Sequence, residues 1–422
     1  MRIIGNRGNT ARKVQAVASG ALASGDTVVV NADGTVSVVS GNDQGLGSGV
    51  VYESASTNVI SIVYDTANNK IVVGYRDNGD SNYGKAVVGT VSGNSISFGS
   101  PVTFYNAAAM NMLNTVFDTN SGKIVFVFKG SSNYGIAIVG TVSGTSISFG
   151  NTTNFLESAI SGDFIGLAYD STNNKVVLGY RSGNLGKSRV GTVSGTNISF
   201  GSEVTFNSSG GASGNQIVYD PNAQKFLFVY QDGGNGAKGT AIVGSVSGTN
   251  ISFGTAVVFN SANSNSFGIS YDANAQKVLI AYMDEGNSYY GTCIVATVSG
   301  TSVSFGSEAV FSAVNTALNQ IVYDASAKKH VIMYRYQVSP NYEGFILSAT
   351  ISGTSVSFET AVSFASGSFG SGGIAYDPDE EKVVIAYSDA DNSSYGTAKV
   401  FTVASTNLTA ENYIGIASNG YA

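Results

Sequence analysis

The chain has 422 residues, of which 43% are hydrophobic and 12% charged, and its formal net charge is −7. The hydrophobic content excludes a disordered chain, and the acidic balance argues against nucleic acid as a partner, because phosphate binding needs a basic face. Fifty-three glycines against four prolines, with no long helical period, indicate many short strands joined by tight turns.

The first 46 residues lie outside any repeat and are expected to form a small β module. Strand patterns at 26–30 and 35–39 flank Asp33-Gly34, which suits a tight hairpin turn. The N-terminal residues lack the apolar stretch of a signal peptide, and no apolar run in the sequence approaches membrane-spanning length. We therefore expect a protein that is made in a cytosol, with no signal peptide or transmembrane segment.

A repeat begins near residue 47, marked by an aspartate that follows an aromatic residue and precedes a lysine by five positions. Neighbouring copies lie 50 to 53 residues apart. Such a period is the mark of a repeat architecture. The aspartates are Asp65, Asp118, Asp170, Asp220, Asp272, Asp324 and Asp377, and the lysines are Lys70, Lys123, Lys175, Lys225, Lys277, Lys329 and Lys382.

Each copy contains four strand-like segments joined by turn residues. Four antiparallel strands in about 50 residues are typical of one blade of a β-propeller. The predicted fold is therefore all-β, a seven-bladed β-propeller of four-stranded antiparallel blades over residues 47–403. A glycine interrupts the fourth strand in most copies and predicts a bulge there. These glycines are Gly99, Gly150, Gly201, Gly254 and Gly306.

The seventh copy lacks its fourth segment, and a matching segment stands at the other end of the repeats. After 396–403 the expected Ser-Gly-Thr-Ser-Ile-Ser-Phe-Gly is missing, whereas 47–52 resembles 99–104. We predict that the N-terminal segment supplies the outer strand of the last blade, a velcro closure of the ring. Residues 404–422, with a strand pattern at 412–417, are then expected to complete the module formed by residues 1–46.

The repeated aspartate and lysine favour a structural role over a binding role, because they are uniform in all seven copies. The aspartate is expected to cap the connection between the first two strands through an Asx turn. The lysine that opens the second strand is expected to pair with it. The aromatic residue that ends the second strand, Tyr75 in the first copy, is expected to pack between blades.

The loop between the second and third strands varies most, so we place binding there. Tyrosine, asparagine and aspartate side by side suit recognition of carbohydrate or protein. No cofactor is expected, although oxygen-rich loops could hold Ca²⁺. The candidate binding residues are Asp77, Asp80, Asn82, Tyr83, Asn133, Tyr134, Asn287, Tyr289, Tyr290, Asn392 and Tyr395. The candidate calcium ligands are Asp77, Asp80, Asp389 and Asp391.

No catalytic constellation is evident, and we expect a protein that is not an enzyme. His330 is the single histidine and lies in a strand pattern, where a structural role is usual. Cys293 is the single cysteine, lies in an apolar strand pattern and is expected to be buried. The arginine triad and aspartate boxes of a propeller sialidase are both missing from the sequence.

The tandem segment Val-Gly-Thr-Val-Ser-Gly-Thr-Ser-Ile-Ser-Phe-Gly at 139–150, with its relatives and the flanks at 21–36 and 408–417, resembles bacteriophage repeat proteins. These proteins, notably of marine and cyanobacterial phages, are described as virion or tail-fibre-like proteins. The resemblance implies a non-enzymatic virion protein that mediates assembly and host-surface attachment. Its partners would be other virion proteins and a host glycan or protein, in a homo-oligomeric or larger assembly. The alternative is a free-standing lectin-like propeller that binds carbohydrate or protein.

Overall fold

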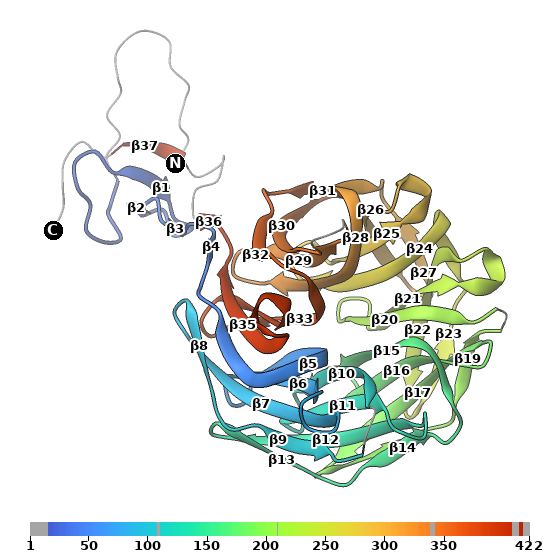
Figure 1. Cartoon of the computed structure of the whole chain (residues 1–422). Coiled ribbons are helices and arrows are strands. Elements are labelled where there is room, and N and C mark those ends of the chain that lie inside the picture. The colour runs from blue at the N-terminus through green and yellow to red at the C-terminus, as the bar shows by residue number, and fades with distance from the viewer. Residues whose placement is uncertain (1–15, 108–109, 209, 338–341, 407–412, 417–422) are drawn as a thin grey trace. The chain divides into compact units, whose positions relative to one another are not determined.

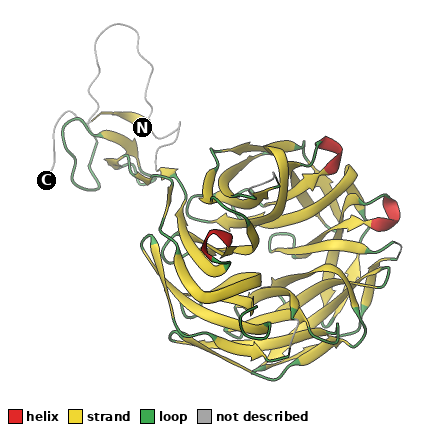
Figure 2. Cartoon of the chain, in the orientation of Figure 1, coloured by secondary structure: helices red, strands yellow, loops and turns green. Residues whose placement is uncertain are grey.

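Antiparallel strands make up nearly all of the regular structure of the computed structural model (Figure 2). It describes residues 16–107, 110–208, 210–337, 342–406 and 413–416. The chain divides into a repeat domain, Leu46–Phe401, and a terminal module composed of Met1–Gly45 and Thr402–Ala422. Within the described residues, no helix is both long and apolar enough to cross a membrane.

Each repeat is a sheet in which an inner, a second, a third and an outer strand pair antiparallel in that order. The inner strands are the second half of β5 (Val50–Asp65), β10 (Asn111–Asp118), β15 (Ile160–Asp170), β20 (Ala212–Asp220), the second halves of β24 (Val257–Asp272) and β28 (Ala309–Asp324), and β33 (Phe369–Asp377). The second strands are β6 (Lys70–Asp77), β11 (Lys123–Lys129), β16 (Lys175–Ser182), β21 (Lys225–Asp232), β25 (Lys277–Asp284), β29 (Lys329–Tyr336) and β34 (Lys382–Asp389).

The third strands pair with outer strands that are broken into two pieces. The third strands are β7 (Tyr83–Ser92), β12 (Gly135–Ser143), β17 (Leu185–Ser194), β22 (Lys238–Ser247), β26 (Tyr290–Ser299), β30 (Gly344–Ser352) and β35 (Tyr395–Thr402). The outer pieces are β8 (Ser95–Phe98), β9 (Val102–Tyr105), β13 (Ser146–Phe149), β14 (Thr153–Leu156), β18 (Asn197–Phe200), β19 (Val204–Asn207), β23 (Asn250–Phe253), β27 (Ser302–Phe305), β31 (Ser355–Phe358), β32 (Val362–Ala365) and β4 (Gly45–Leu46), together with the first halves of β5, β24 and β28. The 3₁₀ turns are η1 (Gly233–Asn235), η2 (Glu285–Asn287) and η3 (Ala390–Asn392).

The second strands form the buried layer of the repeat domain, because a neighbouring sheet covers each of their faces. In β6, Ile71, Val72 and Val73 have no exposed surface. This double burial explains why the second strands are continuous apolar runs rather than alternating ones. The aromatic residue that ends the run is buried in every repeat, which confirms the predicted packing. These residues are Tyr75, Phe128, Tyr180, Tyr230, Tyr282, Tyr334 and Tyr387.

The repeats stand side by side, with each inner strand against the inner strand of the next repeat (Figure 1). The series of contacts runs from β5 with β10 to β28 with β33, and β33 also contacts β5. The first half of β5 pairs antiparallel with β35, placing Val50 opposite Ala398 and Val51 opposite Thr397. A strand from the N-terminal side of the repeats therefore lies in the sheet of the seventh repeat.

The predicted bulge in the outer strand is confirmed, and close packing explains its glycine. In repeat 1, Phe98 lies opposite Gly89 and Val102 opposite Ala86, which leaves one extra residue on the outer strand. A Cβ atom on Gly99 would overlap the carbonyl oxygen of Thr145 in the turn between the third and outer strands of repeat 2. The glycine is thus required by the approach of the next repeat.

The same contact recurs at the junction of the last and first repeats. A Cβ on Gly47 would overlap the carbonyl oxygen of Asn94 in repeat 1. Repeat 6 alone has no glycine at this position and has Glu359 instead. The physical reason is that repeat 7 lacks the turn between its third and outer strands, so nothing there excludes a side chain.

The Asx turn predicted for the repeated aspartate is confirmed. Asp65 has no exposed surface, and its Oδ1 accepts hydrogen bonds from the amides of Ala67 (2.9 Å) and Asn68 (3.1 Å). The same pair of bonds occurs in each of the other six repeats. The turn is therefore a structural device that closes the first hairpin of every repeat.

The ion pair predicted between this aspartate and the following lysine is wrong. Lys70 lies opposite Asp65 in the strand register, but no ion pair joins the two side chains in any repeat that the structure describes. The buried carboxylate already accepts hydrogen bonds from the turn amides. The lysine ammonium would lose its hydration if it were buried beside the carboxylate, so it stays in solvent. Where repeat 6 places a carboxylate within reach, Lys329 pairs instead with Glu359.

The terminal module is a separate small sheet. β1 (Thr27–Val30) pairs antiparallel with β2 (Val36–Val38) on one side and with β37 (Tyr413–Ile416) on the other. A second short pairing joins β3 (Gly41–Asn42) to β36 (Ser405–Thr406). Both ends of the chain contribute to the module, whose small core contains Leu22, Val28 and Val36.

His330 is fully buried in β29, at a position that other repeats fill with Ile71, Val278 or similar residues. Its Nε2 lies 3.6 Å from Asp272 Oδ2, and its ring packs on Tyr323. Burial lowers the pKa of His330 below 6.5, and the Asp272 carboxylate opposes this shift only in part. The structure thus places the histidine in the core, as its strand pattern indicated.

This burial predicts a dependence of stability on pH. Because the folded-state pKa of His330 is below 6.5, the unfolded chain binds the proton more readily. The contribution of His330 to the free energy of unfolding is therefore fully present above pH 6.5, and it is lost as the pH falls below that value. We expect His330→Val to reduce the loss of unfolding free energy between pH 7.5 and about pH 5.5, measured by urea denaturation. An unchanged loss in the variant would contradict the assignment.

Candidate functional site

The loops between second and third strands lie at the same end of each repeat as the connections from outer to inner strands, because hairpins alternate ends. Backbone hydrogen bonds join the two sets: Ile160 donates to the Asn133 carbonyl, and Thr316 donates to that of Tyr289. We call this end of the repeat domain the loop face. It collects the segments that differ most between repeats.

The structure distributes the sequence-predicted site residues over repeats 1, 2, 5 and 7 of the loop face, and it does not gather them into one site. Tyr83, Tyr290 and Tyr395 open third strands, each opposite an aspartate of the second strand. Tyr134 and Tyr289 are instead 37% and 45% exposed. The side chains of Asn133, Asn287 and Asn392 are exposed, and that of Asn82 is half-buried.

Asp77 and Asp80, two candidate calcium ligands, share one ammonium group. Lys85 Nζ lies 2.8 Å from Asp77 Oδ2 and 2.8 Å from Asp80 Oδ2. The second oxygen of the buried Asp77 accepts a bond from the Gly79 amide (2.9 Å). The lysine offsets one of the two negative charges and occupies the space between the carboxylates, so a calcium ion bound here would have to displace it.

The other two candidate ligands belong to the η3 turn of repeat 7. Asp389 stands at the N-cap of η3, and Asp391 Oδ2 accepts a hydrogen bond from Ser366 Oγ (2.9 Å). Among the described residues, no three His, Cys, Asp or Glu side chains gather in a way that could hold a metal ion. Cys293 is a free, fully buried thiol, as its strand pattern predicted.

A shallow cavity of about 430 Å³ lies beside the first variable loop. We call it the rim cavity, and it is lined by Asp80, Tyr83, Thr103, Phe104 and Asn106. Asp80 and Tyr83 come from the predicted loop. Sequence reasoning missed the outer-strand residues Thr103 and Phe104 and the following Asn106, because nothing in the repeat pattern distinguishes them from scaffold.

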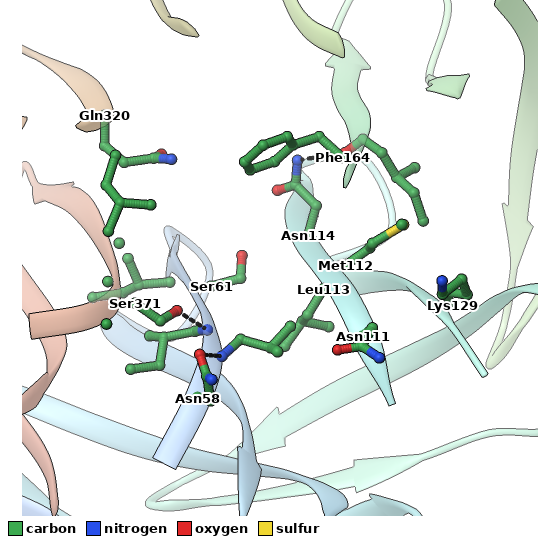
Figure 3. Close-up of a pocket in the computed structure, with 18 of the residues that line it drawn as sticks. Asn58, Ser61, Asn111, Met112, Leu113, Asn114, Lys129, Phe164, Gln320 and Ser371 are labelled. Carbon is green, nitrogen blue, oxygen red and sulfur yellow. Dashed lines mark hydrogen bonds between the residues drawn. The ribbon is translucent and has the colours of Figure 1, made fainter. Parts of the chain in front are cut away.

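A larger cavity of about 570 Å³ lies between inner strands of six repeats (Figure 3). We call it the central cavity. Its lining comes from β5, β10, β15, β20, β28 and β33, with Lys129 added by β11. The residue four positions before the repeated aspartate lines the cavity in repeats 1, 2, 4, 6 and 7. It is Ser61, Asn114, Gly166, Gln216, Gly268, Gln320 and Gly373 in repeats 1 to 7.

The described lining of the central cavity carries few groups suited to acid–base chemistry. Its described lining is made of amide, hydroxyl and apolar side chains, and Lys129 is the one titratable group in it. General acid–base catalysis needs a positioned acid or base with a matched pKa, usually with a partner. An alignment of the seven repeats contains a signal for this cavity. The position four residues before the repeated aspartate varies among Ser, Asn, Gln and Gly.

No protein-family model matches the sequence, and no curated protein matches it. Solved structures do match its fold. The lectin BP39L from Burkholderia pseudomallei aligns with a TM-score of 0.59 and 10% identity, over 87% of this chain and 100% of its own. A structure of the mitotic checkpoint complex aligns with a TM-score of 0.52 and 10% identity, over 85% of this chain and 94% of its own. At such identities the likeness concerns fold alone: this is an all-β, β-propeller-like architecture.

Proposed function

We propose that this chain is a non-enzymatic carbohydrate-binding protein that takes a glycan in the rim cavity. The observation that carries the proposal is the chemistry of that cavity. The half-buried Tyr83 provides aromatic surface, and Asp80, Thr103 and Asn106 provide hydrogen-bonding groups around it, whereas Phe104 belongs to the core beneath. A sugar ring presents apolar C–H faces and hydroxyl edges, and it needs both kinds of partner at once.

The electrostatics of the rim cavity support the same ligand class. The Asp80 carboxylate is about half exposed (48%), and it shares the Lys85 ammonium with Asp77. A carboxylate held in this way accepts strong hydrogen bonds from hydroxyl groups. The fold likeness to a lectin is consistent with this use of the architecture.

Binding on a glycan array tests the proposal. We expect the wild-type protein to bind at least one neutral glycan. Asp80→Asn and Asn106→Ala are each expected to weaken that binding about tenfold, since each removes a hydrogen bond to the ligand. The matched control is Asp391→Asn, which changes a carboxylate on the loop face of repeat 7, outside the rim cavity. Equal binding by Asp80→Asn and the control would reject the rim cavity as the site.

We also propose that the seven repeats close into a seven-bladed ring of residues 47–403, and that residues 1–46 and 404–422 form a separate small module. Three observations support closure. β5 pairs with β35, β33 contacts β5, and Gly47 approaches Asn94 as Gly99 approaches Thr145. A closed ring leaves no sheet edge free for pairing with other chains.

The virion role implied by the phage resemblance stays a prediction, because neither of the two structures named above is described as a phage protein. Carbohydrate binding is compatible with attachment to a host-surface glycan, and assembly with other virion proteins is a further expectation. Mass spectrometry of purified particles tests both ideas. Absence of the protein from particles would leave the free-standing binding protein as the remaining reading.

A further inference from the structure

The central cavity has side chains that the fold itself does not use. Many of its polar groups are occupied within the protein: Ser61 Oγ bonds to Thr115 Oγ1, and Ser371 Oγ accepts from the Ile60 amide. The side chains of Gln216, Gln320 and Lys129 are half-buried in the lining. None of these three side chains has a hydrogen bond or ion pair within the described part of the chain. Half-buried polar groups without partners are unfavourable unless a ligand or water satisfies them.

Lys129 differs from its counterparts in other repeats. The residue after the buried aromatic bridges to the next repeat in three cases: Arg76 donates to Asn111 Oδ1 (2.8 Å), Arg181 to Ser213 Oγ (3.0 Å) and Arg335 to the Phe369 carbonyl (2.9 Å). Lys129 stands at the same register but makes no such bridge. Among the described residues, no side chain pairs with its ammonium group.

The inner strand of repeat 3 carries an enlarged bulge that lines the cavity. Repeat 1 has two residues between the cross-strand pairs of Asn58 and Ser61. Repeat 3 has four, Gly162 to Ile165, between the pairs of Ser161 and Gly166. Bulges re-aim side chains, and Phe164 in this one is 37% exposed although it lies in the lining.

The aromatic ring and the amides face one space. In Figure 3, Phe164, Asn114, Ser61 and Gln320 surround the same opening, and they come from four different inner strands. Asn114 is held in place because its Nδ2 donates to the Ile165 carbonyl (3.0 Å), within the enlarged bulge. The volume of about 570 Å³ suits a small molecule, since such sites span about 300–1,000 Å³.

The charge of the lining selects among small molecules. The described lining contains one cation, Lys129, and no carboxylate, although the whole chain has a net charge of −7. An ammonium group in a partly desolvated cavity favours an anionic group on the ligand. The aromatic face of Phe164 and the free amides of Gln216 and Gln320 suit the C–H face and hydroxyl groups of a sugar ring.

We propose that the central cavity binds a carboxylate-bearing sugar: a ring stacked on Phe164, hydroxyl groups bonded by Gln216 and Gln320, and a carboxylate paired with Lys129. This site is separate from the rim cavity and does not depend on glycan binding there. The ligand class is a hexuronate or another sugar acid of monosaccharide size.

Isothermal titration calorimetry with matched sugars tests the proposal. The probes are galacturonate, glucuronate and N-acetylneuraminate, with galactose and glucose as neutral counterparts. For the wild-type protein we expect at least one acid to bind about tenfold more tightly than the neutral sugars, which is the effect of one charge-assisted hydrogen bond. No binding of any acid at concentrations up to about 10 mM would overturn the proposal.

Variants separate the parts of the site. Phe164→Ala is expected to abolish binding of all probes, whereas Lys129→Gln should remove only the preference for acids. Gln320→Glu retains an acceptor and should weaken acids selectively through charge repulsion. Acid binding that is unaffected by both Lys129→Gln and Gln320→Glu would contradict the assignment.

Two controls distinguish this site from the rim cavity. Asp80→Asn is expected to leave the titrations with sugar acids unchanged, and Phe164→Ala is expected to leave binding on the glycan array unchanged. Thermal melting of each variant establishes that it is folded before it is titrated. If Asp80→Asn abolished acid binding, the acids would be occupying the rim cavity and the central site would be rejected.

Discussion

Replacing Gly150 with alanine is expected to destabilise the repeat domain by about 3 kcal/mol, the upper part of the range for overpacking a filled site. The added Cβ would overlap the carbonyl oxygen of Thr196 in the next repeat. That oxygen belongs to the backbone of a tight turn and cannot rotate away as a side chain would. The Gly150 φ angle is not in the left-handed region, so the cost is one of packing between repeats rather than of backbone strain.

Chemical denaturation of the variant and a matched control measures this effect. The control is Glu359→Ala, at the equivalent position of repeat 6, where repeat 7 has no turn to exclude a side chain. It loses only the partly exposed pair with Lys329, which contributes less than about 1 kcal/mol. Equal destabilisation by the two substitutions would show that close approach between repeats is not what requires the glycine.

Removing residues 1–52 is expected to lower stability by about 4 kcal/mol or more, the scale for losing a buried aromatic side chain. Tyr52 is 6% exposed and packs against the rings of Tyr75 (5.3 Å between centroids) and Phe98 (5.5 Å). The truncation also removes Val50 and Val51, which pair with β35. The seventh repeat would lose its outer strand, and its sheet would be left with an open edge.

Removing residues 1–45 is the matched control, because it deletes the N-terminal part of the terminal module but retains Val50–Asp65 in full. We expect the shorter truncation to leave the melting temperature of the repeat domain within a few degrees of the wild type, and the longer one to lower it by on the order of 10 °C. Equal melting temperatures for the two truncations would refute closure by the N-terminal strand.

Much of the scaffold could be predicted because its signals are local and repeated. The aspartate turn needs only the amides two and three residues further along the chain, so Asp65 and its six equivalents form the same bonds. The buried aromatic at the end of each second strand follows from a continuous apolar run. The predicted ion pair between the aspartate and the lysine is wrong because cross-strand register does not specify where a long side chain places its charge.

The candidate sites were harder to predict because each joins residues that are far apart in sequence. Asp80 and Tyr83 were candidates, but their association with Thr103 and Asn106 depends on how an outer strand returns to the loop face. Phe164 carries no sequence signal of a site, since an aromatic residue in a strand pattern is ordinarily part of the core. Only the enlarged bulge of β15 exposes it.

The sequence by itself determined the number of repeats, the four strands of each, the turns between them and the matching segment at 47–52, because each is encoded within one period of the chain. The tertiary structure alone decided that Gly150 is required by a neighbouring turn, that Glu359 can replace such a glycine, and that Gln216, Gln320 and Phe164 share one cavity. The reason is physical: these properties arise from distances between repeats, and no residue within a single repeat specifies them.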